Sequence, residues 1–513
     1  MSKQTFIKGA LILIVAGMIS RLLGFINRMV LARILGDEGV GIYMLTLPAL
    51  FFVITLSQIG IPVAVSKLVA EAHTNQQYHR IRQIVTTSLI ITVSLSIILT
   101  GLLITLAPYI TTYLILDDRT YLSFIAISPI IVIVAISAVL RGYFQGLQNM
   151  KPQAIAQVIE QIVRIGFVIL FVQLTIPYGL AAASAGAMAS VVIGEFVSLL
   201  YMYWCYKREQ PALLTKSIPK AQSAIQDVYK RLLNIALPTA GTKLIGSATY
   251  FLEPIFVSHT LLIAGYTISE STSLYGQLTG YIMPLLLLPT FITHSLSVAL
   301  IPSISEANAN QHQQTVHYRI RQAIRLSFAS GGVATIIFLL LAPTILNLIY
   351  NTESSSSMLT FMAPFFLLLY IQAPLQAALQ ALEFAKQAMI NSLIGAAVKL
   401  ITLWLLATKP SFGIDGVMLS IIAGVIVVTL LHIVSLAKLI HFTIPMSLVV
   451  KMISLMTVLY VIGEQLTNWL HYLPSILYVS CSIAIITMLY VVGLWLLKIL
   501  SKDEWNQLRT GRF

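Results

Sequence analysis

Apolar runs of about 20 residues recur along the whole chain, and they restrict the possible folds more than any other feature. Each run is long enough to cross a bilayer as an α-helix, and none resembles the short alternating segments of a β-barrel. Of the 513 residues, 58% are hydrophobic and 10% are charged, which excludes a soluble globular domain. We predict an all-α polytopic membrane protein with about 14 transmembrane helices, at roughly 6–34, 41–70, 83–107, 121–146, 152–175, 180–205, 229–262, 273–301, 322–349, 358–382, 387–408, 413–438, 445–468 and 473–499.

The loops between these spans alternate in charge. One set holds most of the lysines and arginines, including Lys8, Lys151 and Lys438, whereas the other set is mainly acidic, with Asp37 and Asp117 among its residues. Because positively charged loops stay in the cytoplasm, both termini are predicted to be cytoplasmic. The formal net charge of +13 follows from the same rule and does not indicate a nucleic-acid partner.

Metal and cofactor patterns are missing from the sequence. The two cysteines, Cys205 and Cys481, lie in apolar runs and have no metal-ligand or disulfide spacing. A Walker A nucleotide-binding pattern is also absent. We therefore expect no metal and no cofactor. Na⁺ and H⁺ remain candidate coupling ions for transport.

The chain is internally duplicated. Residues 71–83 and 306–322 share Glu-Ala-x-x-Asn-Gln followed by Arg-Ile-Arg-Gln, and their starts are 235 residues apart. The same offset relates Pro129 to Pro364 and Arg164 to Lys399. Two copies of about six spans predict two pseudo-symmetric six-helix lobes around a central cavity. The predicted domains are an N-lobe over 1–205, a basic cytoplasmic linker over 206–228, a C-lobe over 229–440, and two further spans with a cytoplasmic tail over 441–513.

Charged residues inside the apolar spans are costly and usually face a polar cavity or a substrate path. Arg21 lies in the middle of the first span, where a cation costs about 2.5–3.5 kcal/mol. Arg33 is about one turn from the next loop, so we expect it to extend to the membrane interface. The predicted substrate-binding cavity uses these charged residues: Arg21, Arg28, Arg141, Arg164, Lys243, Glu253 and Lys399.

Several of these residues have a structural alternative. Arg164 has Glu160 one helical turn away and could form an ion pair with it. Arg141 lies near a span end and could extend to the interface, and Glu253 could form an interlobe ion pair. Matching inner loops hold a second group of charges, which we predict to close the cytoplasmic face as a gate: Glu71, Arg80, Arg82, Glu306, Arg319 and Arg321.

The first span carries a family resemblance. Ser20-Arg21-x-x-Gly24-Phe25, followed by Ala32-Arg33-x-x-Gly36, resembles the MurJ-type lipid II flippases of the multidrug/oligosaccharidyl-lipid/polysaccharide (MOP) superfamily. Gly39-Val-Gly-Ile-Tyr43 and Leu140-Arg-Gly-Tyr-Phe-Gln-Gly146 add to this resemblance, which covers nearly the whole chain. Arg21 occupies a cavity-arginine position of that pattern. The second arginine position is Asn27 here, and the adjacent Arg28 points about 100° away on a helix.

The resemblance implies a flippase that moves a polyprenyl diphosphate-linked oligosaccharide by alternating access. The implied substrate is a peptidoglycan precursor for the spore cortex. The implied location is the bacterial cytoplasmic membrane or, in a sporulating cell, the membrane around the forespore. The expected partners are the lipid-linked saccharide and membrane lipids, with the chain acting as a monomer, alone or with cell-wall synthesis proteins.

Two other functions compete with this prediction. A MATE-type cation-coupled multidrug exporter would need cavity acids, but cations outnumber acids in the first lobe. A membrane glycosyltransferase or polymerase would need carboxylates on an outer loop. Asp117-Asp118 is a tight acidic pair of this kind in the first half, but its loop is short. We therefore predict a transporter and not an enzyme.

Overall fold

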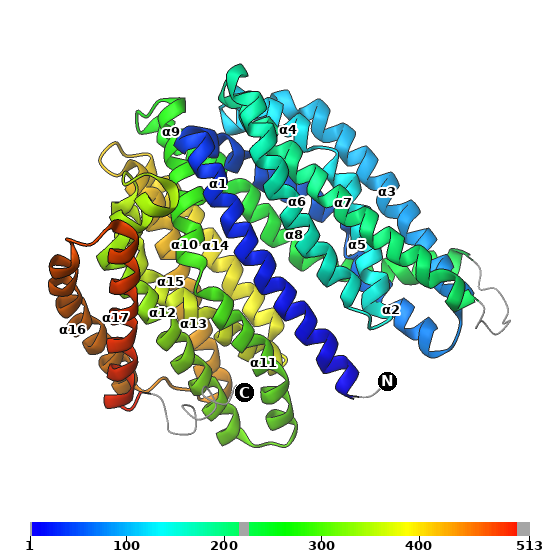
Figure 1. Ribbon diagram of the computed structural model, residues 1–513. Coiled ribbons are helices and arrows are strands. Elements are labelled where there is room, and N and C mark those ends of the chain that lie inside the picture. The colour runs from blue at the N-terminus through cyan, green and yellow to red at the C-terminus, as the bar shows by residue number, and fades with distance from the viewer. Residues whose placement is uncertain (1–2, 215–224, 500–513) are drawn as a thin grey trace. The chain divides into compact units, whose positions relative to one another are not determined.

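The computed structural model describes residues 3–214 and 225–499, and all regular structure in these residues is helical (Figure 1). The chain divides into two compact units, which are described separately. Unit 1 comprises Met1–Leu262 and Tyr266–Gly280, and unit 2 comprises Ile263–Gly265 and Tyr281–Phe513.

Unit 1 is built mainly from long helices. Its helices are α1 (Lys3–Gln58), α2 (Ile61–Thr74), α3 (Tyr78–Tyr109), η1 (Ile110–Ile115), η2 (Asp118–Thr120), α4 (Tyr121–Ile127), α5 (Ile130–Gly146), α6 (Lys151–Thr175), η3 (Ile176–Tyr178), α7 (Leu180–Leu214), α8 (Ile225–Ile263) and α9 (Ile268–Gly276). The π-helix η4 (Gln277–Ile282) leads from unit 1 into unit 2. The apolar core of unit 1 brings together α2, α3, α5 and α7, with Leu232 and Ala236 from α8.

Unit 2 has the same general character. Its helices are α10 (Met283–Leu287), α11 (Thr290–Ala309), α12 (Gln313–Tyr350), α13 (Ser356–Ala381), α14 (Ala385–Ala407), α15 (Gly413–Ile440), α16 (Met446–Leu470) and α17 (Ser475–Leu496). Its core lies between α11, α12, α13 and α15, and α16 and α17 pack onto α12.

The described helices supply most of the predicted spans. Ten stretches are long and apolar enough to cross a membrane, or up to twelve when each bent helix pair is one span. One of the ten, Val15–Thr74, has 60 residues, which is enough for two crossings, and α1 bends inside it at Gly36. Gly36 has φ 65°, a left-handed conformation that glycine adopts without a steric penalty. With that stretch taken as two spans, the described helices supply up to thirteen crossings, against the predicted number of about 14.

The backbone confirms the duplication. Four residues other than glycine have positive φ in the described part of the first half, namely Ile59, Gln76, Leu116 and Gln148. The last three each have a counterpart with positive φ 235 residues later, at Gln311, Asn351 and Glu383, whereas Ile59 has none. The turn hydrogen bonds repeat at the same spacing, because Gln77 N donates to Ala72 O and His312 N donates to Ala307 O. The two halves therefore share turn conformations even where their residues differ.

The packing units do not end where the two sequence copies meet. The second copy was expected to begin near residue 229, yet α8 up to Leu262 and the whole of α9 pack within unit 1. Residues 215–224 of the predicted linker and 500–513 of the predicted tail lie outside the described residues.

Candidate functional site

Arg21 and Arg28 lie on one stripe of α1. Seven residues separate them, which brings their side chains to within about 20° of each other around the helix axis. Gly24 lies between them on this stripe, and a Cβ at Gly24 would be 3.6 Å from Oε1 of Gln161 on α6. Arg164 follows Gln161 by about one turn on the same side of α6. We call Arg21, Arg28, Gln161 and Arg164 the α1–α6 site.

Polar groups without partners surround this site. Arg21 is exposed, whereas Arg28 and Arg164 are half-buried. Arg28 and Arg164 both act electrostatically on the hydroxyl of the buried Tyr43. Asn27 is 5% exposed, and its Oδ1, like Gln161 Oε1, is buried with no hydrogen-bond partner among the described residues. Such groups favour an environment that receives a polar ligand. Arg28, rather than Asn27, shares the stripe with Arg21.

Two of the predicted cavity arginines form ion pairs. Arg164 Nη2 donates to Glu160 Oε1 at 2.5 Å, so the pairing that the sequence offered as an alternative is present. Arg141 on α5 donates from Nη2 to Glu195 Oε1 on α7 at 2.7 Å, and the Glu195 side chain is 6% exposed. Both arginines keep a buried Nε without a partner in the described part of the chain.

The repeat-related cation in unit 2 has similar packing. Lys399 lies on α14, and a Cβ at Gly424 of α15 would be 3.2 Å from the Lys399 Cβ. In the same way, a Cβ at Gly194 of α7 would be 3.3 Å from the Arg164 Cβ. In both copies, therefore, a glycine of the next long helix lets it approach the backbone of the cationic residue closely.

The other two cavity candidates lie on α8. Glu253 is half-buried and acts electrostatically on Tyr250, as Arg28 does. Lys243 lies in α8 as predicted, and its side chain is outside the described part of the structure.

Two of the predicted gate residues contact distant segments of the chain, and two contact residues one turn away. Glu71 forms an ion pair with Arg231 of α8 at 3.2 Å, and both side chains are nearly half exposed. Arg80 donates to Gln77, and Arg319 donates to Gln322. Arg321 Nε donates to the Thr443 carbonyl at 3.3 Å. Arg82, near the start of α3, and Glu306, near the end of α11, are both exposed.

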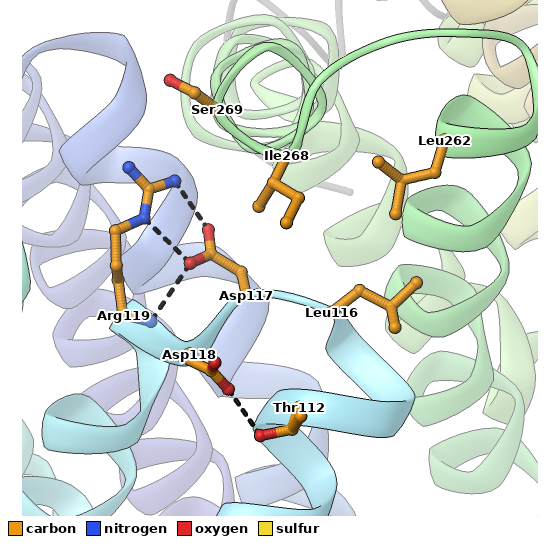
Figure 2. Close-up of a pocket in the computed structure, with 8 residues that line it drawn as sticks. All are labelled: Thr112, Leu116, Asp117, Asp118, Arg119, Leu262, Ile268 and Ser269. Carbon is orange, nitrogen blue, oxygen red and sulfur yellow. Dashed lines mark hydrogen bonds and ion pairs between the residues drawn. The ribbon is translucent and has the colours of Figure 1, made fainter.

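A polar cluster that the sequence did not predict lies beside the bend of α1. We call it the kink cluster, and its members are Asp37, Glu38, Asp117, Arg119, Ser269, Thr272 and Gln277. Arg119 binds both oxygens of Asp117, at 2.9 and 2.8 Å (Figure 2). Its Nη1 also donates to Glu38 Oε1. From α9, Thr272 donates to Asp117 at 2.7 Å and Ser269 donates to Glu38. Gln277, the first residue of η4, donates to Asp37 at 2.6 Å.

Charge stabilises the kink cluster. Burial tends to raise the pKa of Glu38, but hydrogen bonds from Ser269 and Arg119 and attraction to Arg119 outweigh it, so this pKa lies below its ordinary value. Hydrogen bonds to Asp117 raise the pKa of Arg119 above its ordinary value. Glu38 and Arg119 therefore stay ionised at neutral pH, and the Asp117 side chain is only 2% exposed.

Two glycines allow α9 to approach α1 at this cluster. A Cβ at Gly41 would lie 2.0 Å from the Thr272 carbonyl oxygen, and a Cβ at Gly276 would lie 2.4 Å from the Asp37 carbonyl oxygen. Close helix crossings of this kind need small residues. A cavity of about 600 Å³ lies next to the cluster, lined in part by Leu116, Leu262 and Ile268 (Figure 2).

The fold and these sites define the class of protein. An all-helical, multi-pass chain with two homologous halves and arginines inside apolar helices has the architecture of a membrane transporter. The chain belongs to the polysaccharide biosynthesis protein family, whose family model matches residues 6–308. The MatE family model matches residues 278–405. The predicted resemblance to a polysaccharide-type family is thereby confirmed.

Named relatives agree with this family. The chain is 46% identical over 451 residues to Stage V sporulation protein B of Bacillus subtilis (strain 168), across 88% of this chain and 86% of that protein. It is 24% identical to Lipid II flippase MurJ of the same strain, across 77% of this chain and 76% of that protein.

Two solved structures have the same fold. Lipid II flippase MurJ in an inward closed conformation superposes with a TM-score of 0.69 at 15% identity, across 93% of this chain and 97% of that one. An inward-facing multidrug resistance MATE family transporter of the MOP superfamily gives a TM-score of 0.66 at 16% identity, across 82% of this chain and 94% of that one.

Proposed function

We propose that this transporter is a flippase for a polyprenyl diphosphate-linked oligosaccharide, a peptidoglycan precursor for the spore cortex. The α1–α6 site is the observation that carries the proposal. Arg21 and Arg28 share one stripe of a membrane helix, and that stripe faces Gln161 of α6, next to Arg164. A diphosphate is the anionic part of such a lipid, and guanidinium groups bind phosphate oxygens in pairs.

The relatives support this substrate class. Their names combine sporulation, for Stage V sporulation protein B, with lipid II flipping, for MurJ. In this proposal the headgroup enters the polar site while the lipid tail stays in the bilayer. Outward movement of an anion is favoured by an inside-negative membrane potential, by about 2.3 kcal/mol per charge per 100 mV. No coupling ion is therefore required for net transport.

The proposal includes an orientation and a gate. Both termini lie in the cytoplasm, in agreement with the basic loops. The loops with Glu71 and Glu306 then face the cytoplasm, where ion pairs such as Glu71–Arg231 break when the inner side opens. The kink cluster lies on the opposite side, near the bend at Gly36.

A proteoliposome assay tests the proposal. Purified chain is reconstituted with lipid II or with a teichoic-acid lipid precursor, and the accessibility of the headgroup is followed over time. We expect lipid II to be translocated and Arg21→Ala to lose most of this activity. Arg208→Ala is the matched control, because Arg208 is an exposed cation at the end of α7 that stacks on Trp204. Full activity in Arg21→Ala, at an equal protein level, would refute the role of the site.

A multidrug exporter is the second candidate function. The match of the MatE family model over residues 278–405 favours it. The α1–α6 site argues against it, because its two α1 cations would repel a cationic drug. Drug efflux from the same proteoliposomes, together with the absence of lipid II translocation, would establish this alternative.

A further inference from the structure

Uncharged polar residues form a second stripe on α1, next to the stripe of Arg21 and Arg28. Ser20 and Asn27 are seven residues apart, so their side chains lie within about 20° of each other around the helix axis. At about 100° per residue, Gly24 lies between the two stripes, within about 60° of either one. One face of α1 therefore carries a cationic stripe, a glycine and an uncharged polar stripe side by side.

The orientation of the Gln161 amide is fixed by its neighbour on α6. Gln161 Nε2 donates to Glu160 Oε1 at 3.3 Å, and the same carboxylate oxygen accepts from Arg164 Nη2. A reversed amide would set an oxygen against this carboxylate, where neither atom can donate. Oε1 is therefore the other end of the amide, and it lies 3.6 Å from the position that a Cβ at Gly24 would take.

Three polar atoms of these residues have no hydrogen-bond partner within residues 3–214 and 225–499. They are Ser20 Oγ, Asn27 Oδ1 and Gln161 Oε1, and all three are buried. Asn27 as a whole is only 5% exposed. Two of the three atoms are amide oxygens, which accept hydrogen bonds and cannot donate them. Because a buried acceptor without a donor is costly, these two oxygens favour a ligand that brings N–H or O–H groups.

A diphosphate cannot satisfy these two oxygens. Its own oxygens are ionised acceptors, so they bind guanidinium groups such as those of Arg21 and Arg28 and are repelled by a further acceptor. The sugar that follows the diphosphate has the complementary groups, because hydroxyls and an acetamido N–H donate hydrogen bonds. The two stripes of α1 therefore match two successive parts of one substrate, the charged diphosphate and the uncharged sugar.

We propose that Asn27 and Gln161 form a sugar subsite, in which their amide oxygens accept hydrogen bonds from the sugar that is bonded to the diphosphate. This inference rests on the proposed function and extends it from the diphosphate to the saccharide. Gly24 has no side chain to shield Gln161 Oε1, so a small separation of α1 from α6 opens this oxygen to the sugar. An N-acetylated amino sugar is the class that fits, since it offers both N–H and O–H donors.

Two probes of equal charge test the sugar subsite. One is farnesyl diphosphate that carries N-acetylglucosamine, and the other is farnesyl diphosphate capped with a methyl ester. Each is titrated into the detergent-purified full chain, and calorimetry gives the dissociation constants. We expect the sugar-bearing probe to bind at least about tenfold more tightly, since one buried acceptor that gains a donor is worth about this factor. Equal affinity for the two probes would overturn the sugar subsite and leave the diphosphate site intact.

Two substitutions remove the preference for the sugar in different ways. Gln161→Met keeps the length of the side chain but has no amide oxygen. Gly24→Ala adds a methyl group at 3.6 Å from this oxygen, an ordinary contact distance, so the chain should fold normally while the oxygen becomes covered. Each variant should lower the preference for the sugar by about tenfold, whereas the methyl-capped probe should bind as it does to the unaltered chain.

Matched controls exist for both substitutions. Gln173→Met makes the same change at an exposed glutamine of α6. Gly17→Ala adds a methyl group to α1 about two turns before Gly24, where no described atom lies within 4 Å of the new Cβ. Both controls should keep the full preference for the sugar. A preference that persists in Gln161→Met and Gly24→Ala would overturn the sugar subsite. If neither probe binds to the unaltered chain, the diphosphate site is wrong, and the proposed function fails together with the inference.

Discussion

Replacing Gly276 by alanine would place a methyl group inside the crossing of α1 and α9. The new Cβ would lie 2.4 Å from the Asp37 carbonyl oxygen and 2.5 Å from the Gly41 amide nitrogen, whereas ordinary van der Waals contacts begin at 3.4 Å. The helices must therefore separate by about 1 Å, because both obstacles are backbone atoms. Such a shift also stretches the hydrogen bonds that Thr272 and Gln277 donate to Asp117 and Asp37, which measure 2.7 and 2.6 Å.

The expected cost follows from these contacts. Overpacking costs about 1–3 kcal/mol, and each weakened hydrogen bond to a carboxylate adds about 1.5 kcal/mol. Alanine returns about 0.5–1 kcal/mol through its better helix propensity. The expected net loss of stability is therefore about 3–5 kcal/mol.

Thermal unfolding in detergent, followed by the loss of the monodisperse elution peak, measures this loss. Gly166→Ala is the matched control, because a Cβ at Gly166 on α6 meets nothing within 4 Å. That variant should unfold at the same temperature as the unaltered chain or slightly above it. An unchanged midpoint for Gly276→Ala, or an equal decrease in the Gly166→Ala control, would refute the close crossing of α1 and α9.

Three further predictions use the same unfolding measurement. Arg119→Ala removes the bidentate partner of the Asp117 carboxylate, whose side chain is 2% exposed. The free energy of unfolding should therefore fall by about 3 kcal/mol, and a change below about 1 kcal/mol would contradict the pairing. Because the pKa of Glu38 is lowered in the folded state, its contribution is complete above the ordinary carboxyl pKa and is lost as the pH falls below it. The midpoint of the unaltered chain should therefore fall more steeply on acidification below about pH 4.5 than that of Glu38→Gln, and parallel curves would exclude this linkage. Glu71→Gln should cost less than about 1 kcal/mol, since its ion pair with Arg231 is nearly half exposed, and a larger loss would show that this pair is more than a surface contact.

Hydrophobicity and repetition made most of the fold predictable from the sequence. Apolar runs of bilayer length located the helices, and the 235-residue offset located turns whose backbone conformation the structure repeats at Gln76 and Gln311. The boundary between packing units was not predictable, because it depends on α9 packing against α1 rather than on where the second copy begins.

The candidate site was predictable only residue by residue. Arg21 and Arg28 are conspicuous because charge inside an apolar span is rare, and helix geometry places them on one stripe. The partners of buried charges were harder to predict. Glu160 lies one turn from Arg164 and was found, whereas Glu195 lies 54 positions from Arg141. Asp117 and Thr272, which are 155 positions apart, meet only through the tertiary fold.

The left-handed residues that recur in both halves have a consequence for the ancestry of the chain. Leu116 and Asn351 have φ values of 63° and 59°, although leucine tolerates this conformation much less well than asparagine. The turn was therefore retained after duplication while its residue changed, so the surrounding helices, rather than the side chain, enforce the conformation. The turn segments 143–149 and 378–384, which contain Gln148 and Glu383, repeat both the positive φ and the turn hydrogen bonds, so they should be exchangeable between the halves as intact units. A chimaera that carries either segment in both places would keep the helix directions of its host.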